Sequence, residues 1–167
     1  MSADAFALEI EIDGARIEWS PDALRALAAG GSAEPAWRLA GEIDWSALES
    51  LSVVSAAFDD GRLLALVAGR PAGAEGHDAA PPRGILVQPD GEVIELAEAL
   101  LSTEYDSEGA PSRIGLELYP ELGGIPLRVA ADRVSPPRAG TGAGATAMSF
   151  RLEGANGAGL LERVSRA

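Results

Sequence analysis

The chain has 167 residues, which fits one domain, and its 26 acidic residues outnumber 13 basic residues, all arginine, for a net charge of −13. It contains no cysteine, so disulfides, thiolate metal sites and cysteine nucleophiles are excluded, and we expect no cofactor. The acidic field repels phosphate backbones and anionic lipid surfaces, which disfavours nucleic-acid and membrane partners. It weakly favours neutral or cationic ligands.

The chain shows no pattern of a targeting or membrane-spanning segment. Residues 1–5 contain Asp4 and lack a basic start followed by an apolar run, so we expect no signal peptide. The longest nearly uncharged apolar run, 63–69, is too short to span a bilayer. Together with the absence of cysteine, these features indicate a cytoplasmic protein.

The N-terminal part predicts a hairpin followed by a short helix. Apolar residues alternate with polar ones over 6–12 and again over 16–19, on either side of the turn signal Asp13-Gly14. Ser20-Pro21 is typical of a helix start, and we expect about two turns over 21–29 that cover or plug a sheet edge. Residues 32–50 stay ambiguous between a short strand near Trp37 and a helical turn from Asp44.

The middle of the chain predicts two further hairpins. Residues 52–58 and 62–70 flank an Asp-Asp-Gly turn and are apolar on both faces, which indicates a central position. Residues 84–88 and 92–99 flank a Pro-Asp-Gly turn. Residues 94–104 fit both helical and strand spacing, and we favour a strand that runs on towards Tyr105 with a bulge.

Strands are also predicted at 114–118 and 126–134, and a closing glycine-rich hairpin at 148–164. Residues 71–83 and 135–146 are rich in Pro, Gly and Ala and predict exposed flexible loops. Residues 1–167 are therefore interpreted as a single all-β domain of nine or ten antiparallel strands. A meander of serial hairpins favours closure as a β-barrel, with a β-sandwich as the alternative.

Several short motifs in these hairpins resemble one family. They are W-x-A-L (45–48), D-G-R-L (60–63), G-R-P-x-G-A (69–74), S-T-E-Y-D-x-x-G (102–109), I-G-L-E-L (114–118) and F-R-L-E-G-x-x-G-x-G-L-L-E (150–162). The set is similar to the lipocalin-related family of AttH-like and carotenoid 1,2-hydratase (hydroxyneurosporene synthase) proteins and their uncharacterised actinobacterial relatives. The chain has about half the length of the two-barrel members, so the resemblance implies one lipocalin-like barrel or a shortened form of the protein.

Few residues carry recognisable chemistry. His77, the only histidine, precedes Asp78 and is a candidate general base, although a solvated surface histidine is the simpler interpretation. Glu104, if it faces into a barrel, is a candidate acid with a raised pKa. Asp132 and Arg133 are adjacent, so alternation turns only one of them inward, and a salt bridge at the barrel rim is favoured. No metal site is expected.

The aromatic residues are candidates for a ligand pocket. Trp19, Trp37, Trp45 and Tyr105 stand out because aromatic residues make up only 5% of the chain. Trp residues are more often large pieces of a core, so the structural alternative stays open.

Three functional hypotheses remain. The first is a lipocalin-like domain that binds a small, mostly apolar ligand, or that has lost its pocket. The second is a hydratase-like enzyme, which the resemblance implies and which needs an inward carboxylic acid in an apolar cavity. The third is a homodimer or interaction module built on exposed apolar hairpins or unpaired strand edges.

Overall fold

The computed structural model describes residues 6–12, 14–29, 35–73, 82–121, 123–134 and 145–165. This part of the chain forms eleven strands and one helix. Their bounds are β1 Leu8–Ile12, β2 Ala15–Trp19, α1 Pro21–Ala28, β3 Trp37–Gly41, β4 Leu48–Phe58, β5 Leu63–Pro71, β6 Arg83–Val87, β7 Val93–Tyr105, β8 Pro111–Pro120, β9 Leu127–Arg133, β10 Ala145–Leu152 and β11 Ala155–Ser165. No helix of the described residues is long and apolar enough to cross a bilayer.

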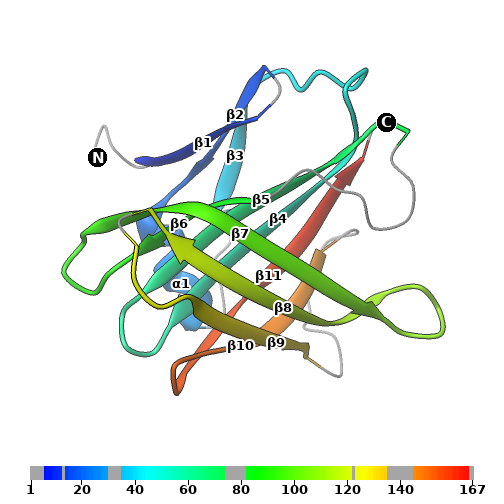
Figure 1. Ribbon diagram of the computed structural model, residues 1–167. Helices are drawn as coiled ribbons and strands as arrows, with labels where there is room; N and C mark the ends of the chain where they lie inside the picture. Colours follow the sequence, from blue (N-terminus) through cyan, green and yellow to red (C-terminus); the bar gives the residue numbers. More distant parts are fainter. Residues whose placement is uncertain are drawn as a thin grey trace.

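Eight strands close into an antiparallel barrel. From β4 to β11 each strand pairs with the next in sequence, and β11 pairs back with β4. Figure 1 shows this ring, with β7 and β8 in front and β4 and β5 behind. The predicted meander of hairpins and the preference for a barrel over a sandwich are thereby confirmed.

The first three strands lie outside the barrel. β1, β2 and β3 form their own antiparallel sheet, and this sheet and α1 lie beside the outer wall (Figure 1). The first hairpin is therefore confirmed as a hairpin, but it is not part of the barrel meander. The predicted helix is confirmed as well: Ser20 Oγ accepts a hydrogen bond from the Ala23 N–H, and Leu24 and Leu27 are buried.

This arrangement gives β4 and β5 two buried faces. Val54, Ala56 and Leu66 point into the barrel, and the intervening residues Val53 and Val67 point outward into a second core shared with α1 and the small sheet. The apolar character of both faces, which predicted a central hairpin, follows from this double burial.

The described parts of both ambiguous stretches, 32–50 and 94–104, are resolved. Residues 94–104 are strand. A bulge between Leu96 and Glu98 switches the inward-facing side chains from even-numbered positions, Ile94 and Leu96, to odd-numbered positions, Ala99 and Leu101. Residues 37–41 form β3, and the turn at 45–47 ends where β4 begins. Both predicted loops are slightly too long, because Pro71, Arg83, Ala145 and Thr146 belong to strands.

The barrel interior is filled over most of its length. Phe58 and Phe150 meet edge to face with ring centroids 6.4 Å apart, and Leu64 and Met148 are buried beside them. A Cβ on Gly159 would lie 2.0 Å from the Ser55 carbonyl oxygen, so β11 approaches β4 closely here. The space left for a ligand therefore lies at one end of the barrel.

Candidate ligand-binding site at the barrel mouth

The open end of the barrel is where β4 begins and where β5, β7 and β11 end. β6 has only five residues, against nine in β5 and thirteen in β7. It pairs with β5 only over Leu63–Val67 and with β7 only over Val93–Glu95. Beyond these pairs, the last residues of β5 and β7 face each other without a β6 residue between them.

A cavity of about 420 Å³ occupies this end, and we call it the mouth cavity. Its polar wall consists of Ser50, Ser52, Arg70, Thr103, Tyr105 and Arg163. Leu101 and Ala68 add apolar surface. A smaller cavity of about 140 Å³ shares Ser52, Thr103, Tyr105 and Arg163 with it and reaches Leu161. The mouth cavity thus combines hydroxyl groups and arginines with an apolar floor.

The charge inside the barrel is opposite to that of the whole protein. Among the described barrel strands, the inward-facing rows carry no Asp or Glu. At the mouth these rows end in three arginines: Arg70, Arg133 and Arg163. The inward-facing rows are therefore basic at the mouth, despite the net charge of −13.

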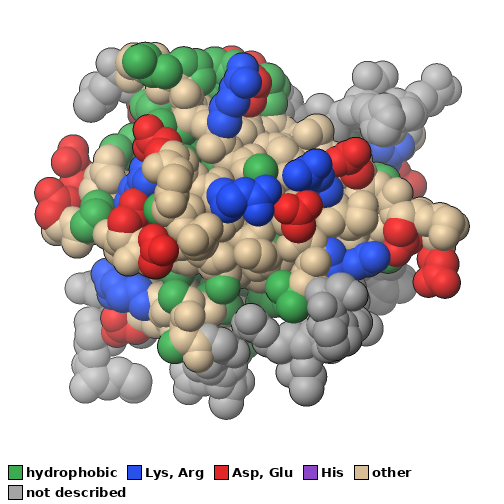
Figure 2. All heavy atoms as spheres, turned by 90° about the horizontal axis from the view of Figure 1, so that it is seen from below, with side chains coloured by type: hydrophobic (Ala, Val, Ile, Leu, Met, Phe, Trp, Pro, Cys, Tyr) green, Lys and Arg blue, Asp and Glu red, His purple; other side chains and the backbone are tan. Residues whose placement is uncertain are grey.

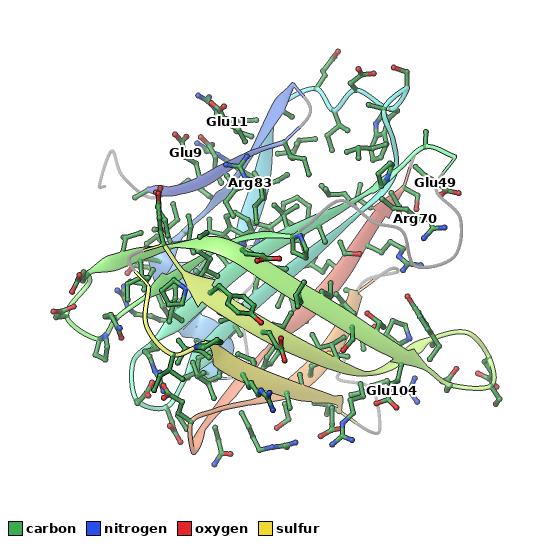
Figure 3. The ribbon with its side chains drawn as sticks, in the orientation of Figure 1. Glu9, Glu11, Glu49, Arg70, Arg83 and Glu104 are labelled. Carbon is green, nitrogen blue, oxygen red and sulfur yellow. The ribbon has the colours of Figure 1, made fainter. Side chains whose placement is uncertain are left out.

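The three arginines have different partners. Arg70 pairs with Glu49 at 2.9 Å, and Figure 3 shows the two side by side on the rim. Arg133 pairs with Asp106 at 2.7 Å and donates to the Pro111 carbonyl oxygen. The hydrogen bond from Arg133 holds the pKa of the Asp106 carboxyl below its ordinary value, with help from the N–H groups of the turn.

Arg163 differs from the other two. Its guanidinium donates to the Tyr105 hydroxyl at 3.1 Å. Among the residues that the structure describes, no carboxylate lies within 4.0 Å of it. Both side chains are exposed at the mouth, so they are accessible from solvent.

The predicted carboxylates lie on the outside of the barrel. Glu104 is exposed on the outer face of β7, opposite Arg113 of β8, and Figure 3 shows it at the edge of the molecule. Asp132 is also outward and pairs with Arg113 and Arg151, both at 3.1 Å. As alternation predicted, its neighbour Arg133 points inward. His77 lies outside the described residues.

Of the four aromatic candidates, only Tyr105 lines the mouth cavity. Trp19 is fully buried in the outer core, and its Nε1–H donates to Ser55 Oγ at 3.0 Å. Trp45 packs against the same core. Trp37 does so too, and its Nε1–H donates to Glu162 Oε1 at 2.9 Å. The three tryptophans therefore join the small sheet and the turn before β4 to the barrel wall.

Glu162 is a partly buried carboxylate on β11 whose pKa is shifted. It points outward from β11 into the same outer core. Burial raises the pKa of the Glu162 carboxyl, and the hydrogen bond from Trp37 opposes that rise. This group lies on the opposite side of the barrel wall from the mouth cavity.

A larger concavity lies on the outer surface of β7 to β10. It has a volume of about 770 Å³ and contains the exposed Leu100. Its charged residues are paired, Arg128 with Glu117 at 3.7 Å and Arg151 with Asp132 at 3.1 Å. Figure 2, seen from below, shows acidic and basic side chains interspersed on this side of the molecule. We call this concavity the outer groove.

Comparison with known proteins identifies no relative. No protein-family model matches the chain, and neither a curated protein nor a solved structure matches it. The resemblance to AttH-like and carotenoid hydratase proteins stays a prediction.

Sequence reasoning missed most of the mouth. Ser52, Thr103 and Arg163 were not singled out, although each lies two residues from an apolar inward position: Val54, Leu101 and Leu161 respectively. Period-two spacing was therefore a usable signal for their direction. That the three strand ends meet follows only from barrel closure.

Proposed function

We propose that this protein binds a small, mostly apolar ligand in the mouth cavity. The observation that carries the proposal is a cavity of about 420 Å³ at the end of the barrel where β5, β7 and β11 end. Ligand sites in proteins are typically concave, have volumes of roughly 300–1,000 Å³ and place a few polar groups around an apolar surface. Leu101 and Leu161 supply that surface, and Ser52, Thr103 and Tyr105 supply the polar groups.

The packed interior limits the ligand's size. Ile114, Leu116 and Phe150 are buried below the mouth and fill the barrel. A long chain would have to displace them, which costs packing energy. The ligand is therefore short, and affinity should rise with chain length only until the floor at Leu101 is reached.

A carotenoid-hydratase type of reaction has less support. Protonation of a double bond needs a carboxylic acid that faces an apolar cavity, and no inward position of the described barrel strands is Asp or Glu. Glu104 and Asp132 both point outward. For a dimer, the exposed large apolar residues are Leu39, Val93, Leu100, Tyr105 and Ile125. They come from β3, β7 and the connection before β9, and this distribution does not by itself define one interface.

The test is an NMR titration of ¹⁵N-labelled protein with octan-1-ol and with octanoate. The proposal predicts saturable shifts of the Ser52 and Thr103 amides with at least one of them. Thr103→Phe, which fills the cavity, should weaken binding at least about tenfold, since it removes most of the space. Ser149→Phe, at an exposed outward position of β10, is the matched control and should bind normally. Absence of saturable binding, or equal effects of both variants, would overturn the proposal.

A further inference from the structure

We infer that the ligand of the mouth cavity carries an anionic group, of the carboxylate class, and that Arg163 binds it. This inference rests on the proposed function and names the chemistry of the ligand. It runs against the expectation from net charge, which favours neutral or cationic ligands. The charges that line the mouth cavity, and not the net charge of the whole protein, decide which ligand it favours.

Acidic and basic residues are distributed differently between the outside and the inside of the barrel. The chain carries twice as many acidic as basic residues, yet the described inward positions carry three arginines and no carboxylate. Glu49 and Asp106 offset two of these positive charges, so the attraction for an anion comes from Arg163, whose charge lies beside low-dielectric walls and acts more strongly there than on an open surface.

Among the partners that the structure describes, only one of these three arginines has no carboxylate beside it. The guanidinium of Arg70 is engaged by Glu49 and that of Arg133 by Asp106. Arg163 contacts a neutral hydroxyl, that of Tyr105, at 3.1 Å. A guanidinium presents five N–H donors, so this one bond leaves donors for a ligand.

The Arg163–Tyr105 pair is arranged so that both side chains can donate hydrogen bonds to a ligand. The Tyr105 oxygen accepts a hydrogen bond from Arg163, which leaves the phenolic O–H free to donate. The two side chains come from the ends of β11 and β7 and line the same cavity, so their donors can converge on one carboxylate. A planar guanidinium matches a carboxylate in two parallel hydrogen bonds.

Apolar side chains lie beneath the Arg163–Tyr105 pair. Leu101 and Leu161 are inward on the same two strands, one inward step from Thr103 and Arg163. A ligand whose carboxylate meets Arg163 would place its first carbons against these leucines. The site is thus matched to a short amphiphilic acid.

The test compares three ligands with the same eight-carbon chain: octanoate, octan-1-ol and octylammonium. Affinities are measured by calorimetry or by NMR titration at pH 7 and low salt. Octanoate should bind at least about tenfold more tightly than octan-1-ol, the usual gain from a charge-assisted hydrogen bond. Octylammonium should bind most weakly. Added chloride salt should lower the affinity for octanoate and for neither of the other two ligands.

Two variants distinguish the effect of the Arg163 side chain at the mouth from the effect of removing one positive charge from the protein. Arg163→Gln should lose at least about tenfold in octanoate affinity and leave octan-1-ol affinity unchanged. Arg128→Gln makes the same change in charge at a position with an 84% exposed side chain on the outer face of β9, and should behave as wild type. Thermal unfolding of each variant, followed by circular dichroism, establishes that it is folded.

The outcomes distinguish the two proposals. Equal binding of octanoate and octan-1-ol, with shifts at the mouth, would overturn the anionic ligand and leave the proposed function standing. Tighter binding of octylammonium, or equal losses in Arg163→Gln and Arg128→Gln, would also overturn it. Binding of none of the three ligands would overturn both.

Discussion

The hydrogen bond between Trp19 and Ser55 ties the small sheet to the barrel wall, and its removal is the sharpest test of the fold. Both residues are 0% exposed, and the Nε1–Oγ distance is 3.0 Å. Ser55→Ala leaves the indole N–H buried without its acceptor, which costs about 1–3 kcal/mol. Trp19→Phe removes the same bond and leaves part of the indole volume empty, for about 2–4 kcal/mol.

The double variant distinguishes a real bond from mere proximity. Once Trp19 is Phe, the change of Ser55 to Ala removes no further bond and strands no polar group. We therefore expect the double variant to be more stable than the sum of the single losses predicts, by about 1–2 kcal/mol. Urea denaturation followed by far-ultraviolet circular dichroism measures this without depending on tryptophan fluorescence. Additive losses, within about 0.5 kcal/mol, would refute the assignment of this bond.

Two further predictions concern the barrel wall. Gly159→Ala would place a Cβ 2.0 Å from the Ser55 carbonyl oxygen, so we expect the free energy of unfolding to fall by about 3 kcal/mol or more. In the control Gly115→Ala the new Cβ meets only the Ser102 hydroxyl, at 3.0 Å, and the free energy of unfolding should fall by under about 1 kcal/mol. Comparable urea midpoints for the two variants would contradict the close approach of β4 and β11. Because burial raises the pKa of Glu162, its ionisation is resisted in the folded state, and stability is lost as pH rises above the ordinary glutamate value of 4.5. Glu162→Gln should therefore be more stable than wild type at pH 7 and match it below pH 4.5, and a difference that does not change with pH would count against this account.

Local signals in the sequence were sufficient to predict the hairpins. Asp13-Gly14 and Asp90-Gly91 mark turns, and alternation over the flanking residues gives the strands and their inward faces. A bulge was also predicted within 94–104, where helical and strand spacing compete, and it lies between Leu96 and Glu98. These features depend on neighbours in the chain, which is why one sequence reveals them.

Local signals did not reveal which sheet each hairpin joins. Residues 8–19 alternate as well as any barrel hairpin, but α1 interrupts the series and β3 pairs back with β2 rather than with β4. Their apolar face then covers the outside of β4 and β5. That choice depends on contacts between segments far apart in the chain, and alternation carries no information about them.

The candidate site was predictable only in part, for the same reason. Sequence reasoning weighed carboxylates and aromatic residues one at a time, and of these Tyr105 lines the mouth cavity. Arg163 and Ser52 are ordinary residues near strand ends. They become a site only when β11 closes against β4 and brings both beside the end of β7.

The most direct test of ligand binding at the mouth uses two adjacent leucines on opposite faces of β7. Leu101 points into the barrel beneath the mouth cavity, and Leu100 is 46% exposed and lines the outer groove. Isotope-filtered nuclear Overhauser spectra of the octanoate complex would report which leucine methyl groups contact the ligand chain. We predict contacts to Leu161, which lines the mouth and not the outer groove, together with contacts to Leu101, which borders both. Contacts to Leu100 alone would place the ligand in the outer groove and contradict it.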